Sequence, residues 1–173
     1  MSLTRADAAL AAAGDELWLA VSELAVTVHE DRPAASDLAV VDDLAERVSE
    51  LQGTAHQIRE LCRSGQVLQM PARLDAIAAL ADAAETYYWH ALRSHDPVAK
   101  LRAASRGRGD EWLAWRRSVE DAVRRCEPPL GELAGALRVA WHEVGALLSL
   151  GMVGTNATFD FNAQSTDNPR RPS

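Results

Sequence analysis

Isoleucine, aromatic residues, lysine and long apolar runs are all scarce in this sequence. Isoleucine occurs only at Ile58 and Ile77, and aromatic residues make up 5% of the 173 residues, whereas alanine and leucine dominate. Because alanine and leucine lose little conformational freedom in a helix, this balance favours helices over strands. No run of about 18 apolar residues is present, so we expect no transmembrane helix and no membrane partner.

Cysteine is limited to Cys62 and Cys126, and the two are far apart in the chain. The first residues, MSLTRADAAL, contain early acidic residues and do not resemble a secretory signal. A cytoplasmic protein with two free thiols is therefore expected. Lys100 is the only lysine among 18 basic residues, and this excess of arginine, with that of alanine, is typical of a GC-rich genome and favours a bacterial source.

The motifs that mark common catalytic and metal sites are also missing. None of the five histidines has an acidic residue three positions before it, so the Glu-x-x-His pattern of di-iron bundles is absent. The chain contains no Gly-x-Ser-x-Gly, no Gly-x-Gly-x-x-Gly and no P-loop. Both cysteines fall on apolar stripes, where a thiol behaves as a small buried hydrophobe. We expect no enzymatic activity, no catalytic residues, no metal and no cofactor.

Apolar residues recur at steps of three and four along most of the chain, which predicts amphipathic helices. The helices are expected over residues 4–30, 36–65, about 71–91, a short segment 97–105, and 110–150. Prolines interrupt the last of these at Pro128-Pro129, so we expect two collinear segments with a kink. The stripe of the third helix is predicted to pass through Ala84, Tyr88 and Ala91.

The predicted fold is all-α. Short connections make neighbouring helices antiparallel, so residues 1–150 are expected to form an antiparallel helical bundle of four long helices plus a short one. Residues 151–173 are polar and rich in Asn, Thr, Ser and Pro, and are expected to form a flexible C-terminal tail.

The first helix carries more apolar residues than one core stripe needs. Leu17, Val21, Leu24 and Val28 form the stripe, whereas Trp18, Leu19, Ala25 and Val26 lie outside it. Such a helix is either central in the bundle or part of an interface.

Aromatic residues supply the candidate partner-binding positions. Tyr87-Tyr88-Trp89-His90 spans most of a helical turn, so at least one ring should face outward, and Tyr87, Trp89 and Trp18 are candidates for an interface. A wide core face with exposed ring edges is the alternative. In the tail, Phe159 and Phe161 would share one face if extended, which suits strand addition or a short docking motif; two incidental phenylalanines in a disordered tail are the alternative.

Charge is distributed unevenly. Residues 1–60 hold 12 acidic and four basic residues, whereas nine basic residues fall within residues 93–125. Arginines followed by tryptophans are a pattern that binds single-stranded nucleic acid or another anion. The candidate anion-binding residues are Arg102, Arg106, Arg108, Arg116 and Arg117. The alternative is that Trp112 and Trp115 are core residues and the arginines are solvated or paired with acidic helices.

These observations favour a non-enzymatic protein–protein interaction module, an accessory or adaptor subunit of a bacterial multi-component system whose partner is another subunit or a second copy. One alternative is an acidic immunity-like, antitoxin-like or defence-associated protein that neutralises a basic partner. A second is a nucleic-acid binder that uses residues 93–125, which is not favoured. A third is a helical enzyme or ligand carrier whose site leaves no motif.

Overall fold

The computed structural model describes residues 5–34, 38–64 and 71–150, and within them all regular structure is helical. The helices, in chain order, are α1 (Arg5–His29), α2 (Leu38–Arg63), α3 (Pro71–Tyr87), a π-helical turn η2 (Tyr88–Leu92), α4 (His95–Ala104), α5 (Asp110–Arg125) and α6 (Glu127–Ser149).

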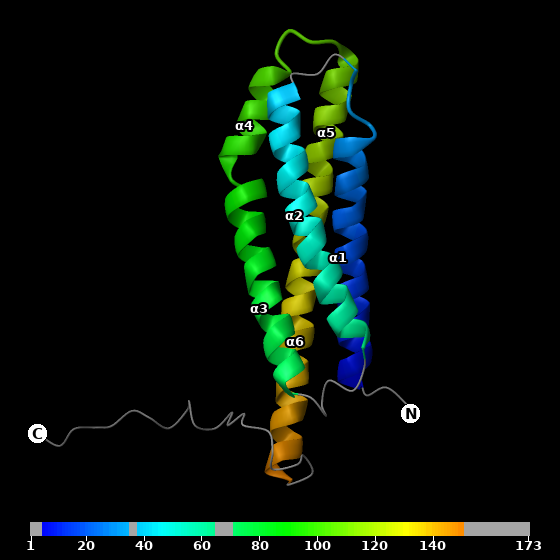
Figure 1. Cartoon of the computed structure of the whole chain (residues 1–173), viewed down its shortest axis with the longest axis vertical. Helices are drawn as coiled ribbons and strands as arrows, with labels where there is room; N and C mark the ends of the chain where they lie inside the picture. Colours follow the sequence, from blue (N-terminus) through cyan, green and yellow to red (C-terminus); the bar gives the residue numbers. More distant parts are fainter. Residues whose placement is uncertain (1–4, 35–37, 65–70, 151–173) are drawn as a thin grey trace, which may run out of the picture.

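The helices pack side by side as four long rods, which we call columns (Figure 1). Helix α1 forms the first column and α2 the second, each without interruption. The third column consists of α3, η2 and α4, and the fourth consists of α5 and α6. Helix α1 packs against α2 on one side and against α5 and α6 on another, while α3 packs against α2 and α6. Each column runs opposite to the one before it. This arrangement confirms the predicted antiparallel all-α bundle.

The predicted apolar stripes form the core. Leu17, Leu24 and Val28 of α1 are completely buried, as are Ile58 of α2 and Leu133 of α6. Burial of such side chains contributes about 1.5–3 kcal/mol each, which is the main force that holds the columns together.

The third column is interrupted by the π-helical turn. The backbone N–H of Arg93 donates to the carbonyl of Tyr88 at 2.7 Å, five residues back. The wider turn moves the buried positions from Ala84 to Tyr88 and then to Leu92, leaving Ala91 half-buried. The expectation that Ala91 continues the stripe was therefore wrong, because it assumed the ordinary α-helical period.

The short helix also begins earlier than expected. It was expected to span residues 97–105, but α4 starts at His95 and Ser94 occupies the N-cap position. Ser94 has the extended backbone that an N-cap residue adopts, although its side chain makes no capping hydrogen bond.

The fourth column is interrupted at Cys126, and α5 and α6 continue nearly in line (Figure 1). Pro128 and Pro129 lack a backbone N–H, so they cannot donate to the carbonyls of Arg124 and Arg125 as the next residues of a helix would. Both prolines instead lie in the first turn of α6, where the missing N–H groups are tolerated. The predicted kink is confirmed.

A buried hydrogen bond joins the two interrupted columns. The hydroxyl of Tyr88 donates to the carbonyl of Val123 at 3.0 Å, and the Tyr88 side chain is completely buried. The backbone N–H of Cys126 reaches the same carbonyl at 3.2 Å, closing the end of α5. This hydrogen bond thus connects the π-helical turn of the third column to the end of α5 in the fourth.

Helices α1 and α2 approach each other closely at Gly14. A Cβ atom at this position would lie 3.1 Å from Cβ and 3.3 Å from Sγ of Cys62, and 3.4 Å from Cα of Arg59. Glycine therefore permits close contact between the two helices here, whereas Gly53, on the exposed side of α2, has nothing within 4 Å of the same position.

We expect Tyr88→Phe to lower the free energy of unfolding by about 1–2 kcal/mol, because it removes a buried hydrogen bond and leaves the Val123 carbonyl with one partner fewer. Urea denaturation measures this loss. Tyr87→Phe is the matched control, since the neighbouring Tyr87 is only partly buried and water can replace its partner. Equal losses for the two variants would contradict a special role for the Tyr88 hydroxyl.

The two glycines should respond oppositely to alanine. Gly53→Ala is expected to raise the free energy of unfolding by roughly 0.5–1 kcal/mol, the usual gain in an exposed helix interior. Gly14→Ala is expected to lower it by about 1 kcal/mol, because crowding against Cys62 and the α2 backbone exceeds that gain. Thermal and urea unfolding of both variants test the difference, and a similar gain at both sites would show that the approach is not tight.

Candidate protein-binding surface on helix α1

The outward face of α1 carries large apolar side chains in contact with solvent. Leu19 is 60% exposed and Val26 is 46% exposed. They belong to a row of exposed residues spaced by four, three, four, three and four, which we call the outer strip. The outer strip consists of Ala12, Glu16, Leu19, Glu23, Val26 and Glu30. Apolar and acidic residues alternate along it, so it is neither a core stripe nor an ordinary charged surface.

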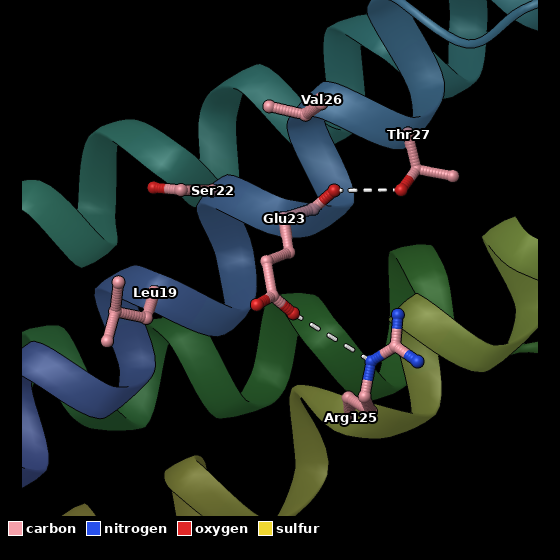
Figure 2. Close-up of a pocket in the computed structure, with 6 residues that line it drawn as sticks. All are labelled: Leu19, Ser22, Glu23, Val26, Thr27 and Arg125. Atoms are coloured by element: carbon pink, nitrogen blue, oxygen red, sulfur yellow. Dashed lines mark hydrogen bonds and ion pairs between the residues drawn. The ribbon is translucent and has the colours of Figure 1, made fainter.

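Figure 2 shows the part of this strip from Leu19 to Val26, where a shallow pocket of about 520 Å³ lies open to solvent. It is lined by Leu19, Ser22, Glu23, Val26, Thr27 and Arg125. The Glu23 carboxylate lies 3.9 Å from Nε of Arg125 at the end of α5, and the Thr27 hydroxyl donates to the Glu23 carbonyl at 2.9 Å. The surface is broad and open, which suits a protein partner better than an enclosed small molecule.

The rotation of α1 about its axis is set by contacts with its neighbours. On one side, Nε1 of the buried Trp115 donates to the carbonyl of Thr27 at 2.8 Å. On the other, Nε of Arg59 and Nε of Arg63, both on α2, donate to Asp15 at 3.1 and 2.8 Å. With both flanks of α1 attached in this way, Leu19 and Val26 are left facing solvent.

The Asp15 contact is electrostatically favourable. Partial burial by itself would raise the pKa of Asp15, but the hydrogen bonds and positive charges of Arg63 and Arg59 outweigh it and hold that pKa below its usual value. The carboxylate stays ionised and paired at neutral pH, so it is part of the α1–α2 contact rather than a free acid of the outer strip.

Glu16 has the opposite environment. The carboxyl of Glu132 on α6 shares a hydrogen bond with the carboxyl of Glu16 and lies in its negative field, and both effects raise the pKa of Glu132. Both residues are exposed. Two carboxylates held this close repel each other when both are ionised, so at neutral pH this end of the outer strip carries uncompensated negative charge.

The aromatic residues singled out in the sequence occupy different surroundings. Trp18 is partly buried, with its ring 5.4 Å from that of His56 and the Arg59 guanidinium 5.6 Å from its centre, so α2 already covers one face. Tyr87 is partly buried and hydrogen-bonds to Glu50. Trp89 is 44% exposed, but it lies on the third column, across the bundle from α1. Phe159 and Phe161 lie outside the described residues.

Trp18, Tyr87 and Trp89 are therefore not brought together on one surface. The sequence singled out Leu19 and Val26 as surplus to the core stripe, but the glutamates that alternate with the apolar residues of the outer strip, Glu16, Glu23 and Glu30, were missed. The signal that identifies them is a second row at steps of four and three, out of phase with the core stripe.

The arginine-rich segment is largely occupied by internal contacts. Nε of Arg102 donates to Glu120 at 2.8 Å, and Nε of Arg116 lies 4.0 Å from the same carboxylate. The Arg108 guanidinium lies 4.8 Å from the centre of the Trp112 ring, and its Nε donates to the carbonyl of Ala104. Arg106 and Arg117 are exposed. The five candidate arginines thus do not form one open basic surface.

The tryptophans of this segment also belong to the core. Trp112 and Trp115 are each 4% exposed and pack edge to face, with ring centres 5.4 Å apart. Their faces are not open to stack on bases, which is what single-strand binding requires.

The two thiols are poorly suited to nucleophilic chemistry. Burial is the main cause that raises the pKa of Cys62 and of Cys126 to about 12. Among the described residues, no group of three or more His, Cys, Asp or Glu side chains is placed to hold a metal ion. Nor is any of the helices within 5–34, 38–64 and 71–150 both long and apolar enough to cross a bilayer.

No protein-family model matches the chain, and no curated protein and no solved structure is similar enough to it to establish a relationship. The functional argument therefore depends on the surface itself.

The Glu16–Glu132 pair predicts a pH-dependent stability. Because the pKa of Glu132 is raised in the folded state, the pair stabilises the fold below the usual pKa of a glutamate, and this stabilisation is lost as the pH rises through the raised value. Glu132→Gln should therefore raise the melting temperature slightly at pH 7, and the gain should vanish on acidification. Thermal unfolding between pH 3 and 8 checks this. Glu85→Gln, which removes an exposed charge from α3, is the control, and identical pH profiles for the two variants would contradict the pairing.

Proposed function

We propose that this chain is a non-enzymatic interaction module, an accessory or adaptor subunit that binds a protein partner through the outward face of α1. The observation that carries the proposal is the exposure of Leu19 and Val26, two large aliphatic side chains one helical heptad apart on a helix fixed by its neighbours on both flanks. Large apolar side chains that are exposed on a rigid element, with polar residues beside them, are typical of protein interfaces.

The surroundings of the other candidate residues, the two cysteines and the arginine-rich segment, support the same conclusion. The buried thiols have pKa values of about 12, which leaves almost no thiolate at neutral pH. Nucleic-acid binding through residues 93–125 is less well supported, because Trp112 and Trp115 are buried and Arg102 and Arg116 share Glu120. An immunity-like or antitoxin-like protein that neutralises a basic partner is the alternative, and the acidic residues of the outer strip are compatible with it.

The proposal is tested by comparing partner capture by matched surface variants of the full-length tagged chain in its native host. We expect the double variant Leu19→Ser/Val26→Ser to lose the partner, because it removes the apolar side chains that a partner would cover. Exposed substitutions change stability by about 0.5 kcal/mol or less, so the variant should stay folded, as circular dichroism can verify.

Two control variants decide between surfaces. Leu150→Ser removes a leucine that is 71% exposed at the C-cap of α6, and this variant should retain the partner. Trp89→Ser tests the aromatic residue that the sequence favoured. Loss of the partner with Trp89→Ser, together with full retention by the α1 double variant, would overturn the assignment to α1.

A further inference from the structure

The spacing of the outer strip indicates which secondary structure of a partner can pack along it. Steps of four and three repeat every seven residues from Ala12 to Glu30, which is the spacing of a two-helix contact. At 1.5 Å per residue the strip is about 27 Å long. An extended strand, with its two-residue period, would not stay aligned with these positions over that length. The repeat thus favours a helix lying along α1.

The composition of the strip defines the residues that such a helix must offer. One row of positions, Ala12, Leu19 and Val26, is apolar, and the other, Glu16, Glu23 and Glu30, is acidic. A helix placed on it needs apolar side chains over the first row and positive charges over the second, because carboxylates covered without a countercharge would be strongly unfavourable.

The charges already on the bundle leave the glutamates open to a cation. Glu16 lies against another carboxylate, that of Glu132. Glu23 has Arg125 at 3.9 Å, but the two side chains are 65% and 58% exposed, and a pair this exposed contributes little. A lysine or arginine from a partner would relieve the first repulsion and strengthen the second site.

We propose that the partner presents a basic amphipathic helix, with an apolar residue at each heptad step and lysine or arginine beside it, which lies along the outer strip of α1. This inference rests on the proposed function and specifies the partner. A second copy of this chain is a poor occupant, because its own outer strip would bring three further glutamates, whereas the basic residues of α1 are limited to Arg5 and His29 at its two ends.

The test uses a designed helical peptide of about three heptads as the probe. It carries leucine at the seam and lysine or arginine on the flanks. One control peptide has the same composition in scrambled order, and a second has glutamate in place of the basic residues. Titration of each fluorescein-labelled peptide with the full chain at about 0.15 M salt, followed by anisotropy, gives the dissociation constants.

We expect the basic amphipathic peptide to bind at least about tenfold more tightly than either control peptide. Leu19→Ser/Val26→Ser should weaken its binding about tenfold or more. Glu16→Gln/Glu23→Gln/Glu30→Gln should weaken it and reduce its salt dependence. The matched variant Glu46→Gln/Glu60→Gln/Glu85→Gln removes the same net charge from exposed positions on α2 and α3 and should bind as the unaltered chain does.

Three outcomes would overturn the inference. Equal binding of the scrambled peptide, or equal weakening by the two glutamine triple variants, would mean that only bulk charge is recognised. A dimer of the full chain that Leu19→Ser/Val26→Ser converts to a monomer would make a second copy the occupant. Finally, a cellular partner that requires Leu19 and Val26, with no peptide binding there, would leave the proposed function intact and remove only the basic helix.

Discussion

The hydrogen bond from the Tyr88 hydroxyl to the Val123 carbonyl fixes the relation between the two interrupted columns of the bundle. Both columns break at this level, one at a π-helical turn and the other at Cys126 before two prolines. With Tyr88 completely buried, one break cannot slide along the other without losing this bond. The axial position of the fourth column determines which of its residues contact α1. Trp115 donates to the Thr27 carbonyl, Arg125 lies beside Glu23, and Glu132 lies beside Glu16.

Most of the fold could be predicted, because apolar residues at steps of three and four mark the buried face of each helix. The stripes through Leu17, Ile58 and Leu133 lie in the core, and the proline pair marks the break in the last column. The π-helical turn could not be predicted in the same way. Tyr87, Tyr88, Trp89 and His90 offer bulky side chains on all sides of a helix, so their period is ambiguous. The wider turn buries Tyr88, whose hydroxyl donates to the Val123 carbonyl, and Leu92, and this tertiary contact is not visible in the local sequence.

The candidate surface was harder to predict, because exposure on α1 depends on where its neighbours stand. Trp18 and Leu19 are adjacent in sequence and about 100° apart around the helix. One meets His56 and Arg59 of α2, and the other faces solvent. The sequence holds two rows at steps of four and three, and the row with more large apolar residues is correctly assigned to the core. That the second row is left open follows only from the packing of α2, α5 and α6 around α1.

The location of charge matters more here than the total of −7. Much of the chain neutralises its charges locally: Asp15 is held by two arginines of α2, and Glu120 by Arg102 and Arg116. These pairs cancel the long-range field around themselves and leave little for a partner to recognise. The outer strip differs, since Glu16 meets a second carboxylate and Glu23 has one distant, exposed arginine. The outer strip therefore places negative charge beside two exposed aliphatic side chains, Leu19 and Val26. A partner that covers the apolar residues would also have to supply positive charge opposite the glutamates. The same strip would therefore select both the shape and the charge of its partner.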